Sequence, residues 1–405
     1  MLERNLKQNI ERARADTPVV VLQGPRQCGK TTLVKEIAIP IKAHYFTLDD
    51  FTTLSLLKED PLSFLRNLEG PIILDEVQRA PDTLLAIKNL VDTHRVPGKF
   101  LLTGSTSILS LRTLADSLAG RMEILTLWPL SQGERDAHKG TFIDDAFANR
   151  LPQQSDTRLF KESMIFEGGF PEAVSRNHAD RRRAWFSSYL TSVIQKDIRD
   201  LSNIEGFSDV PALTRVLATR IGNLFNAADI SRVVKIPTTT LKRYIALLEA
   251  TFMIKFIYPW HTNLRQRMVK APKVFFCDTG LVSYLLGLNE KQALQSSMFI
   301  GSLLENFVAV ELMKQSTWSQ VQPQIYHYRT QDQKEIDFIL ENGAGDIVAI
   351  EVKHTASPSS TDLATLKKLA IEMGPRLKKG ILLYTGSKIL PVTEVIGCYP
   401  IASIY

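Results

Sequence analysis

The sequence contains only three cysteines, Cys28, Cys277 and Cys398, in a chain of 405 residues. Their wide spacing fits neither a disulfide framework nor a pair of zinc ligands. Long apolar runs are also missing, since stretches such as "VVVL" and "PIILDE" end well before the roughly 20 residues that a membrane helix needs. We therefore expect no transmembrane span. The charged start, "MLERNLKQNIERARAD", lacks the apolar centre of a secretion signal, and we expect a reducing, cytoplasmic location.

The net charge excludes few classes of protein. A net charge of +6 makes an anionic partner reasonable, but it is well below the charge density of a dedicated nucleic-acid-binding domain. With 44% apolar and 23% charged residues, the chain has the composition of a soluble globular protein, and its length allows two or three domains.

A phosphate-binding loop is encoded near the start. The stretch "PVVVLQGPRQCGKTTLVKEIA" predicts a strand, a turn and a helix. Gly24 to Thr31 match GxxxxGK[S/T], in which small residues let backbone N–H groups wrap a polyphosphate. Lys30 would reach the β- and γ-phosphates, and the Thr31 hydroxyl would bind Mg²⁺. The residues expected to hold ATP are Gly24, Pro25, Arg26, Gln27, Cys28, Gly29, Lys30, Thr31 and Thr32.

A second motif follows where a nucleotide-hydrolysing fold needs it. "GPIILDEVQRAP" is an apolar strand that ends in Asp75 and Glu76. In a parallel sheet covered on both faces, acidic residues at the carboxyl end of such a strand fall beside the phosphates. Asp75 would hold the Mg²⁺ shell and Glu76 would polarise the attacking water. The two motifs together predict ATP binding and hydrolysis.

Four further residues could sense or contact the nucleotide. The strand "KFLLTGSTS" ends near Thr103 and Ser105, of which Ser105 is the preferred γ-phosphate sensor, although an ordinary helix cap is an equal alternative. Arg121, in "LAGRMEILTLWPLS", is interpreted as an arginine finger in the same or a neighbouring subunit, or as a solvated surface arginine. Arg79 is a weaker candidate. Use of Arg121 by a neighbour would make the protein a homo-oligomer.

The middle of the chain encodes a helix-turn-helix pattern. In "NAADISRVVKIPTTTLKRYIALLEATFMIKFIYPW", one helix ends near Val234 and the next starts at Thr238. Lys242 and Arg243 lie on its polar face, which suits contacts with DNA phosphates, and the apolar segment after Ala250 would form the wing. Winged helices also dock proteins or act as ATPase lids, so the pattern alone leaves the partner open.

Near the end, two strands bring charged residues together. "EIDFIL" and "IVAIEVKHT" predict a hairpin in which Asp337 lies opposite Ile350 and Glu351, with Lys353 on the same face as Glu351. Asp337 and Glu351 would bind Mg²⁺, Lys353 would orient water, and Glu305 of an earlier helix would complete the metal shell. A cross-strand ion pair on an exposed sheet is the equal alternative.

The motifs as a set resemble a known family. "GPRQCGKTT", "IILDEVQ", "LLTGSTS", "LAGR", "EGGFPE", "DTGL", "GSLLENFVAVEL" and "EIDFIL...IVAIEVKH" look like bacterial and archaeal AAA+-type ATPases with a C-terminal domain of unknown function. That tail is similar to the restriction-endonuclease-like (PD-(D/E)xK) fold of Holliday-junction resolvases. The acidic helix residue, the Asp and the ExK of that fold would be Glu305, Asp337, Glu351 and Lys353.

We therefore expect an α/β protein of three parts: a P-loop AAA+-type ATPase domain with a parallel sheet (1–155), a helical region with a winged helix (156–298), and a restriction-endonuclease-like α/β domain (299–405). Its cofactors would be ATP and Mg²⁺. The leading hypothesis is an ATPase that acts on DNA with Mg²⁺-dependent nuclease capacity. The alternative is an ATP-switched regulator whose tail binds a partner without cleavage.

Overall fold

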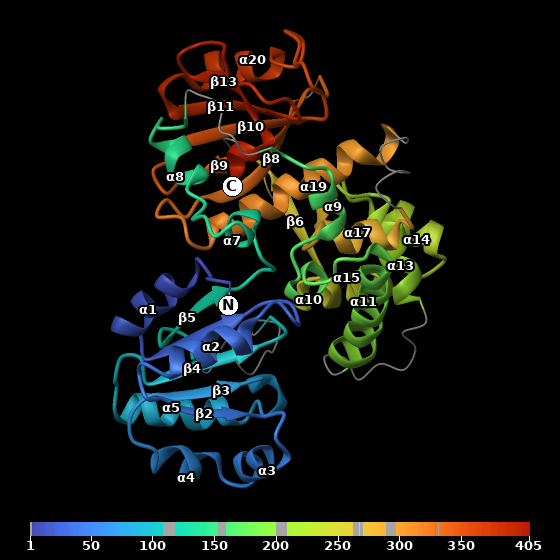
Figure 1. Cartoon of the computed structure of the whole chain (residues 1–405). Helices are drawn as coiled ribbons and strands as arrows, with labels where there is room; N and C mark the ends of the chain where they lie inside the picture. The colour runs from blue at the N-terminus through green and yellow to red at the C-terminus, as the bar shows by residue number, and fades with distance from the viewer. Residues whose placement is uncertain are drawn as a thin grey trace.

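A computed structural model describes residues 2–107, 118–152, 159–199, 209–261, 267, 270–288, 297–330 and 332–405. Figure 1 shows three parts in chain order: an α/β part in blue, a helical part in green and yellow, and a carboxyl-terminal sheet in orange and red. The expected boundary near residue 155 lies outside the described residues. Within them, no helix is long and apolar enough to cross a membrane.

The first part is built on a five-stranded sheet of order β2-β3-β4-β1-β5, in which all neighbouring strands are parallel. Its three central strands are buried along their whole length, as expected for a parallel sheet covered on both faces. The predicted parallel α/β domain is thus confirmed. The strands are β1 (Val19–Gln23), β2 (His44–Thr47), β3 (Ile72–Asp75), β4 (Phe100–Gly104) and β5 (Met122–Thr126).

Helices cover both faces of this sheet because successive residues of a strand point to opposite sides. Val20 and Leu22 pack with α1 and α2, whereas Val19 and Val21 pack with the helices of the other face. The loops after β1 and β3 leave from the same sheet edge, since the strands are parallel. The helices are α1 (Lys7–Asp16), α2 (Lys30–Ala38), α3 (Phe51–Glu59), α4 (Pro61–Arg66) and α5 (Thr83–Thr93).

Short helices dominate the middle part. The chain forms α7 and α8 between residues 132 and 147, and Phe142, Ile143 and Ala146 give α8 an apolar face that packs on the carboxyl-terminal sheet. α11 continues as a π-helical segment, η3 (Val193–Ile198). The α-helices are α7 (Gln132–Arg135), α8 (Phe142–Phe147), α9 (Ser163–Glu167), α10 (Pro171–Val174), α11 (Ala179–Ser192), α13 (Val210–Ala218), α14 (Ala227–Val234), α15 (Thr238–Ala250) and α17 (Thr279–Leu285).

Two glycine motifs of this part meet at Asp278. Its buried carboxylate caps α17 by accepting from the backbone N–H of Leu281, and it also accepts from the N–H of Gly169 at 2.6 Å. Gly168 has a φ of +69°, and a Cβ there would lie 2.3 Å from Asp278 Oδ1, so only glycine fits. The "EGGFPE" and "DTGL" stretches therefore form one packing unit.

The helix-turn-helix pair forms as two consecutive helices in contact, α14 and α15. Lys235 adopts the left-handed conformation at the end of α14, and Pro237 precedes α15, which together make the turn. The strands that follow, β6 (Ile254–Pro259) and β7 (Lys273–Phe276), are antiparallel to each other, and β6 joins the carboxyl-terminal sheet beside β8. The expected wing is thus built into a larger sheet, and the winged-helix assignment stays a prediction.

The carboxyl-terminal sheet has eight strands in the order β12-β13-β11-β10-β9-β8-β6-β7 and mixes parallel with antiparallel neighbours. The expected hairpin is β9-β10, whose register pairs Phe338 with Ile350. The restriction-endonuclease-like fold stays a prediction. The remaining elements are α19 (Ser297–Ser316), β8 (Gln324–Arg329), β9 (Glu335–Glu341), β10 (Ile347–Lys353), α20 (Ala364–Met373), β11 (Leu377–Tyr384), β12 (Leu390–Pro391) and β13 (Ile396–Pro400).

The two faces of this sheet meet different helices. Val348 and Ile350 of β10 pack into the core that contains α19, whereas Ile347 and Ala349 pack with α20. Figure 1 shows α19 running between the sheet and the middle helices. One helix therefore contributes to both parts, which places its side chains at their junction.

Candidate functional site

The phosphate loop connects β1 to α2. Gly24 has a φ of +151°, and a Cβ there would lie 2.1 Å from the Leu127 carbonyl oxygen, while Gly29 has a φ of +104°. Both positions therefore require glycine. The Lys30 ammonium is buried and donates to the carbonyl oxygens of Gly24 and Pro25, each at 2.9 Å. A bound polyphosphate would exchange these carbonyls for stronger acceptors on the ligand.

The predicted metal ligands of the ATP site lie together. Thr31 Oγ1 donates to Asp75 Oδ2 at 2.9 Å, and Tyr45 Oη donates to the same oxygen at 2.9 Å. Thr103 Oγ1 donates to the other oxygen, Oδ1. A hydroxyl and a carboxylate are the donors that Mg²⁺ prefers, so this set fits the ion. The carboxyl ends of the parallel strands β3 and β4 thus bring Thr103 to Asp75, as expected for this sheet edge.

Glu76 is positioned by a chain of hydrogen bonds. Its backbone adopts a φ of +63°, and its N–H donates to Thr103 Oγ1 at 3.0 Å. Gln78 Nε2 donates to the Glu76 carboxylate and to Ser105 Oγ, the latter at 3.0 Å. Ser105 is buried, and its hydroxyl accepts from Gln78, the residue that orients Glu76. A direct contact between Ser105 and the γ-phosphate stays a prediction.

A cleft of about 750 Å³ opens over the loop, a size typical of small-molecule sites. One wall belongs to the loop and to Glu76, and the other comes from α10, α11 and the segment between them. The loop residues on its surface are Arg26, Gln27, Gly29, Lys30, Thr31 and Thr32. Gly24, Pro25 and Cys28 do not line this space. Cys28 Sγ is buried against the Leu127 carbonyl at 3.1 Å, and burial raises the pKa of its thiol, as expected for a small neutral filler.

Sequence reasoning missed the opposite wall of this cleft. Arg176, which follows α10, adds a cation, and Trp185 and Tyr189 of α11 add aromatic surface. Arg26 of the loop also reaches across, because its guanidinium binds the carboxylate of Asp197 in η3, with Nη2 to Oδ1 at 2.7 Å and Nε to Oδ2 at 3.0 Å. Asp197 is only 5% exposed. No local motif announces these residues, which come to the loop through the tertiary fold.

Arg121 is not brought to the loop of its own chain. It precedes β5, and the register pairs Met122 with Val19, at the start of β1. The loop leaves from the far end of β1, so Arg121 lies at the opposite sheet edge, where it binds Asp92 at 2.5 Å. A role in a neighbouring subunit stays a prediction. Arg79 pairs with Asp49 on the surface.

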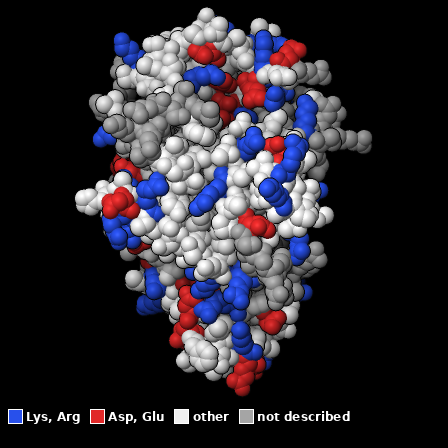
Figure 2. All heavy atoms as spheres, turned by 90° about the vertical axis from the view of Figure 1, so that its right-hand side faces the viewer, with Lys and Arg blue, Asp and Glu red and all other residues white. Residues whose placement is uncertain are grey.

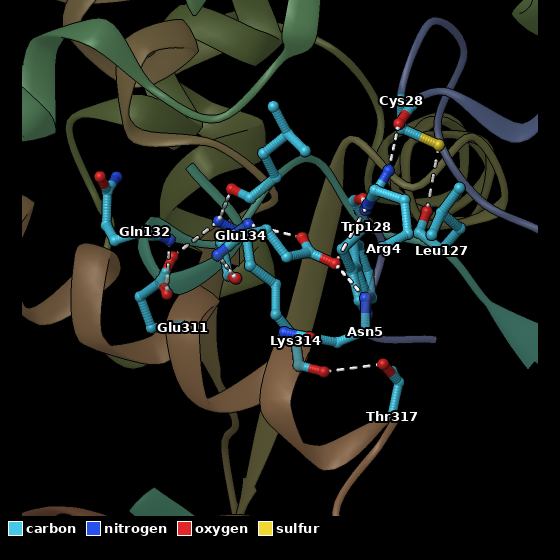
Figure 3. Close-up of polar contacts among 12 residues, drawn as sticks. Arg4, Asn5, Cys28, Leu127, Trp128, Gln132, Glu134, Glu311, Lys314 and Thr317 are labelled. Carbon is cyan, nitrogen blue, oxygen red and sulfur yellow. Dashed lines mark hydrogen bonds and ion pairs between the residues drawn. The ribbon is translucent and has the colours of Figure 1, made fainter. Parts of the chain in front are cut away.

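A buried polar network supports the loop from behind (Figure 3). Arg4 donates to the carbonyl oxygens of Cys28 and Trp128, at 2.8 and 2.6 Å, and to Glu134 at 3.1 Å. Glu134 in turn accepts from the N–H of Asn5 and caps α7. The guanidinium of Arg4 is 8% exposed, and its charge is balanced by one buried carboxylate. The amino-terminal segment is therefore a structural part of the phosphate loop.

The network extends into α19. The N–H of Gln132 donates to Glu311 at 3.1 Å, and Lys314 donates to Glu311 and to the Leu130 carbonyl, both at 2.8 Å (Figure 3). All three charged or amide groups are buried. α7, which follows the last strand of the parallel sheet, is thereby fixed to the helix that carries Glu305.

The expected second metal site is arranged differently from the prediction. Glu305 and Asp337 both face Lys273, whose Nζ lies 2.9 Å from Glu305 Oε1 and 3.6 Å from Asp337 Oδ1. Lys353 Nζ binds Glu351 Oε1 at 2.7 Å, which confirms that these two side chains share a face. Among the residues that the structure describes, no three His, Cys, Asp or Glu side chains are grouped as a metal ion needs. The donor set does not fit Mg²⁺ in this arrangement.

Burial dominates the electrostatics of this cluster. Burial, reinforced by the Asp337 charge, raises the pKa of Glu305 to about 8 and that of Glu351 to about 7. The Lys273 ammonium keeps its proton, because the neighbouring carboxylates raise its pKa and outweigh its burial. The sequence signal for Lys273 is a charged residue at the head of the apolar stretch "KVFF", which the sequence reading left aside.

The predicted DNA-contacting residues of α15 are accessible. Lys242 and Arg243 are exposed, as is Thr239, while the opposite stripe of the helix is buried. Figure 2 faces the side formed by the middle helices and shows Lys and Arg side chains interspersed with Asp and Glu. On this face, the described cations are therefore interspersed with acidic groups.

Three family models match successive regions of the chain. Residues 16–135 match a family described as an AAA domain, and residues 158–292 and 300–404 match two domains of unknown function, DUF8612 and DUF4143. The AAA match contains the phosphate loop and the acidic pair described above. Residues 16–135 thus form a P-loop ATPase-like AAA domain.

Two curated proteins are similar to almost the whole of this chain. The uncharacterized protein Rv2008c of Mycobacterium tuberculosis (strain ATCC 25618 / H37Rv) is 28% identical over 403 residues, which cover 98% of this chain and 83% of the relative. Mb2031c of Mycobacterium bovis, also uncharacterized, matches with the same values.

Among solved structures, the Walker-type ATPase PabY2304 of Pyrococcus abyssi is similar over 70% of this chain and 96% of its own, with 15% identity and a TM-score of 0.43. The RuvB Holliday junction branch migration motor of Thermotoga maritima matches 62% of this chain and 88% of its own, with 19% identity and a TM-score of 0.30. At these scores neither structure bears on function.

Proposed function

We propose that the protein binds and hydrolyses ATP with Mg²⁺ and acts on DNA, and that nucleotide turnover in the cleft changes how its middle and carboxyl-terminal parts engage the nucleic acid. The contact of Thr31 with Asp75, beside Lys30 and an oriented Glu76, carries the first half of this proposal. These groups converge on one sheet edge under a cleft large enough for a nucleotide.

Each residue has a defined part in hydrolysis. Lys30 would leave the loop carbonyls for the phosphates, and the backbone N–H groups at the start of α2 would hold the polyphosphate. Glu76, held by Gln78, would orient and deprotonate the attacking water. Arg176 would face the phosphates from the second wall. Mg²⁺ bound by Thr31 and Asp75 would neutralise charge that develops on the phosphates.

The DNA half of the proposal rests on the exposed cations of α15, Lys242 and Arg243, on a helix-turn-helix pair. Of the two roles expected for the tail, we favour binding without cleavage, because Lys273 occupies the space between the carboxylates that would hold the metal. The single contacts with phosphate that such a surface provides would be sensitive to salt.

Two variants of the cleft test the ATPase. Lys30→Ala should lose nucleotide binding, whereas Glu76→Gln should bind ATP as the parent does and hydrolyse it at least about a hundredfold more slowly, as expected for loss of a general base. Turnover that survives in Glu76→Gln would reassign the base. Binding that survives in Lys30→Ala would place the nucleotide elsewhere.

A cleavage assay tests the role of the tail. The parent and Asp337→Ala would be incubated with linear, supercoiled and branched DNA in Mg²⁺ or Mn²⁺, with and without ATP. We expect no cutting by either protein, together with DNA binding that depends on salt. Products that the parent forms and Asp337→Ala does not would show that the tail is a nuclease.

A further inference from the structure

Lys273 is an unusual residue for its position. It heads β7, an edge strand whose four residues are all buried, and its side chain is only 3% exposed. A lysine in such a place is costly unless its charge is matched by nearby anions. Three carboxylates from two other elements meet its ammonium: Glu305 of α19 at 2.9 Å, and Glu335 and Asp337 of β9 at 3.5 and 3.6 Å.

The other carboxylate oxygens of the cluster are mostly engaged by protein donors. Asp337 Oδ2 accepts from the N–H of Val352 at 2.9 Å, and Glu351 Oε1 binds Lys353. Among the carboxylate oxygens of the cluster, as the structure describes them, only Glu351 Oε2 is buried without a hydrogen-bond partner. A metal ion needs several oxygens at about 2.0 to 2.6 Å, and these groups are already held by N–H and ammonium donors.

The carboxylate cluster can be reached from a neighbouring cavity. A cavity of about 400 Å³ lies beside the cluster and is lined by both Lys273 and Glu335, with Arg220, Asn226 and Arg329 around it. An ion could therefore reach the carboxylates from outside. What separates them from such an ion is the ammonium group itself.

We infer that Lys273 is the resident cation of the carboxylate cluster, that it takes the place of a divalent metal there, and that the cluster is a metal-independent lock between the middle and carboxyl-terminal parts. This inference goes beyond the proposed function and does not depend on ATP binding.

The backbone around the cluster supports the role of a lock. The N–H of Gly222 donates to the Val274 carbonyl at 3.0 Å and the N–H of Phe225 donates to Pro272, which ties the segment between α13 and α14 to β7. Gly222 has a φ of +70°, and a Cβ there would lie 2.6 Å from Glu305 Oε2. The segment that leads into the helix-turn-helix pair is thus tied to β7 beside the cluster, and Lys273 joins β7 to α19 and β9.

The experiment measures Mn²⁺ binding by calorimetry on the full-length chain without nucleotide. A Thr31→Ala parent is used throughout, so that the ATP site contributes no hydroxyl ligand. Lys273→Met removes the ammonium but keeps a long apolar stem, and Lys273→Arg keeps a cation. Lys255→Met, at an exposed position of β6, is the matched control. Thermal unfolding in EDTA and in Mn²⁺ is followed for each protein.

The parent, Lys273→Arg and Lys255→Met should take up no Mn²⁺ at the cluster and unfold at the same temperature in EDTA and Mn²⁺. Lys273→Met should unfold at a lower temperature than the parent in EDTA, and Mn²⁺ should bind it and raise that temperature again. If Lys273→Met does not fold, the test is Mn²⁺ uptake by the Thr31→Ala parent. Uptake that the further change Asp337→Asn abolishes would overturn the inference, and no uptake would support it. A folded Lys273→Met protein without Mn²⁺ uptake would also overturn it.

Discussion

Replacing Asp197 with asparagine should tighten ATP binding. In the structure the Asp197 carboxylate holds the Arg26 guanidinium through two nitrogens, so this arginine of the cleft is already engaged by a protein carboxylate. The carboxylate is also a buried negative charge within one arginine length of the loop. Its removal therefore frees a cation for the ligand and deletes a repulsive charge.

The magnitude follows from Coulomb's law. At an effective dielectric of about 20 and a separation on the order of 8 Å, one unit of phosphate charge is repelled by about 2 kcal/mol. Screening at physiological salt reduces this by roughly half, since the Debye length is also about 8 Å. About 1 kcal/mol corresponds to roughly fivefold tighter binding. Loss of the ion pair will lower stability at the same time, because Arg26 keeps only one acceptor there.

The assay is titration with a fluorescent ATP analogue at two salt concentrations, under conditions without turnover. Arg26→Ala should weaken binding, and the double variant should resemble Arg26→Ala. Asp180→Asn removes the same charge from an exposed position on α11 and should leave affinity unchanged. If Asp197→Asn weakens binding as Arg26→Ala does, the pair holds the loop in its binding shape, and the reasoning is wrong.

Three other predictions concern stability and DNA. Burial and the nearby Lys273 charge lower the pKa of His327 to about 4, below its usual 6.5. The neutral imidazole therefore contributes its full stability above pH 6.5. As the pH drops to 4, the free energy of unfolding should fall by at most about 3 kcal/mol. His327→Phe should flatten this part of the unfolding profile. Gly168→Ala should lower the free energy of unfolding by more than about 3 kcal/mol, because it adds backbone strain and displaces a buried carboxylate. Gly287 has the same φ in open space, so Gly287→Ala should lower it by only about 1 kcal/mol in chemical denaturation. Lys242→Ala with Arg243→Ala should reduce the salt dependence of DNA binding by about two units of slope, and an unchanged slope would remove α15 from the interface.

The ATP site could be predicted because its signals are local. The loop, its two glycines and the acidic pair are each encoded within a dozen residues, and the parallel sheet then brings Thr31 to Asp75. The hairpin of β9 and β10 was predictable for the same reason, since alternation and a turn fix its register. Residues that act across the fold were not. Arg26 and Asp197 are 171 positions apart, and no pattern in the sequence relates them.

The carboxylate cluster shows that one set of acidic residues is compatible with two different cations. Strand alternation and hairpin register correctly place Asp337 beside Glu351, but they contain no information about which cation fills the space between the carboxylates. Lys273 enters from β7, a strand that the sequence assigned to a different part. A buried lysine and a metal ion balance the same negative charge, so the acidic residues alone predict both.

The positions of these groups relate the nucleotide cleft to the rest of the chain. One wall of the cleft belongs to the ATPase domain and the other to α10 and α11, so closure around a ligand would move the middle part. Lys273 fastens that part to α19 and β9, and the segment that leads into the helix-turn-helix pair is tied to β7 beside the same lock. The middle part and the tail would then move together. The Lys273→Met variant should therefore bind ATP as tightly as the parent does. ATP binding should no longer change the affinity of this variant for DNA.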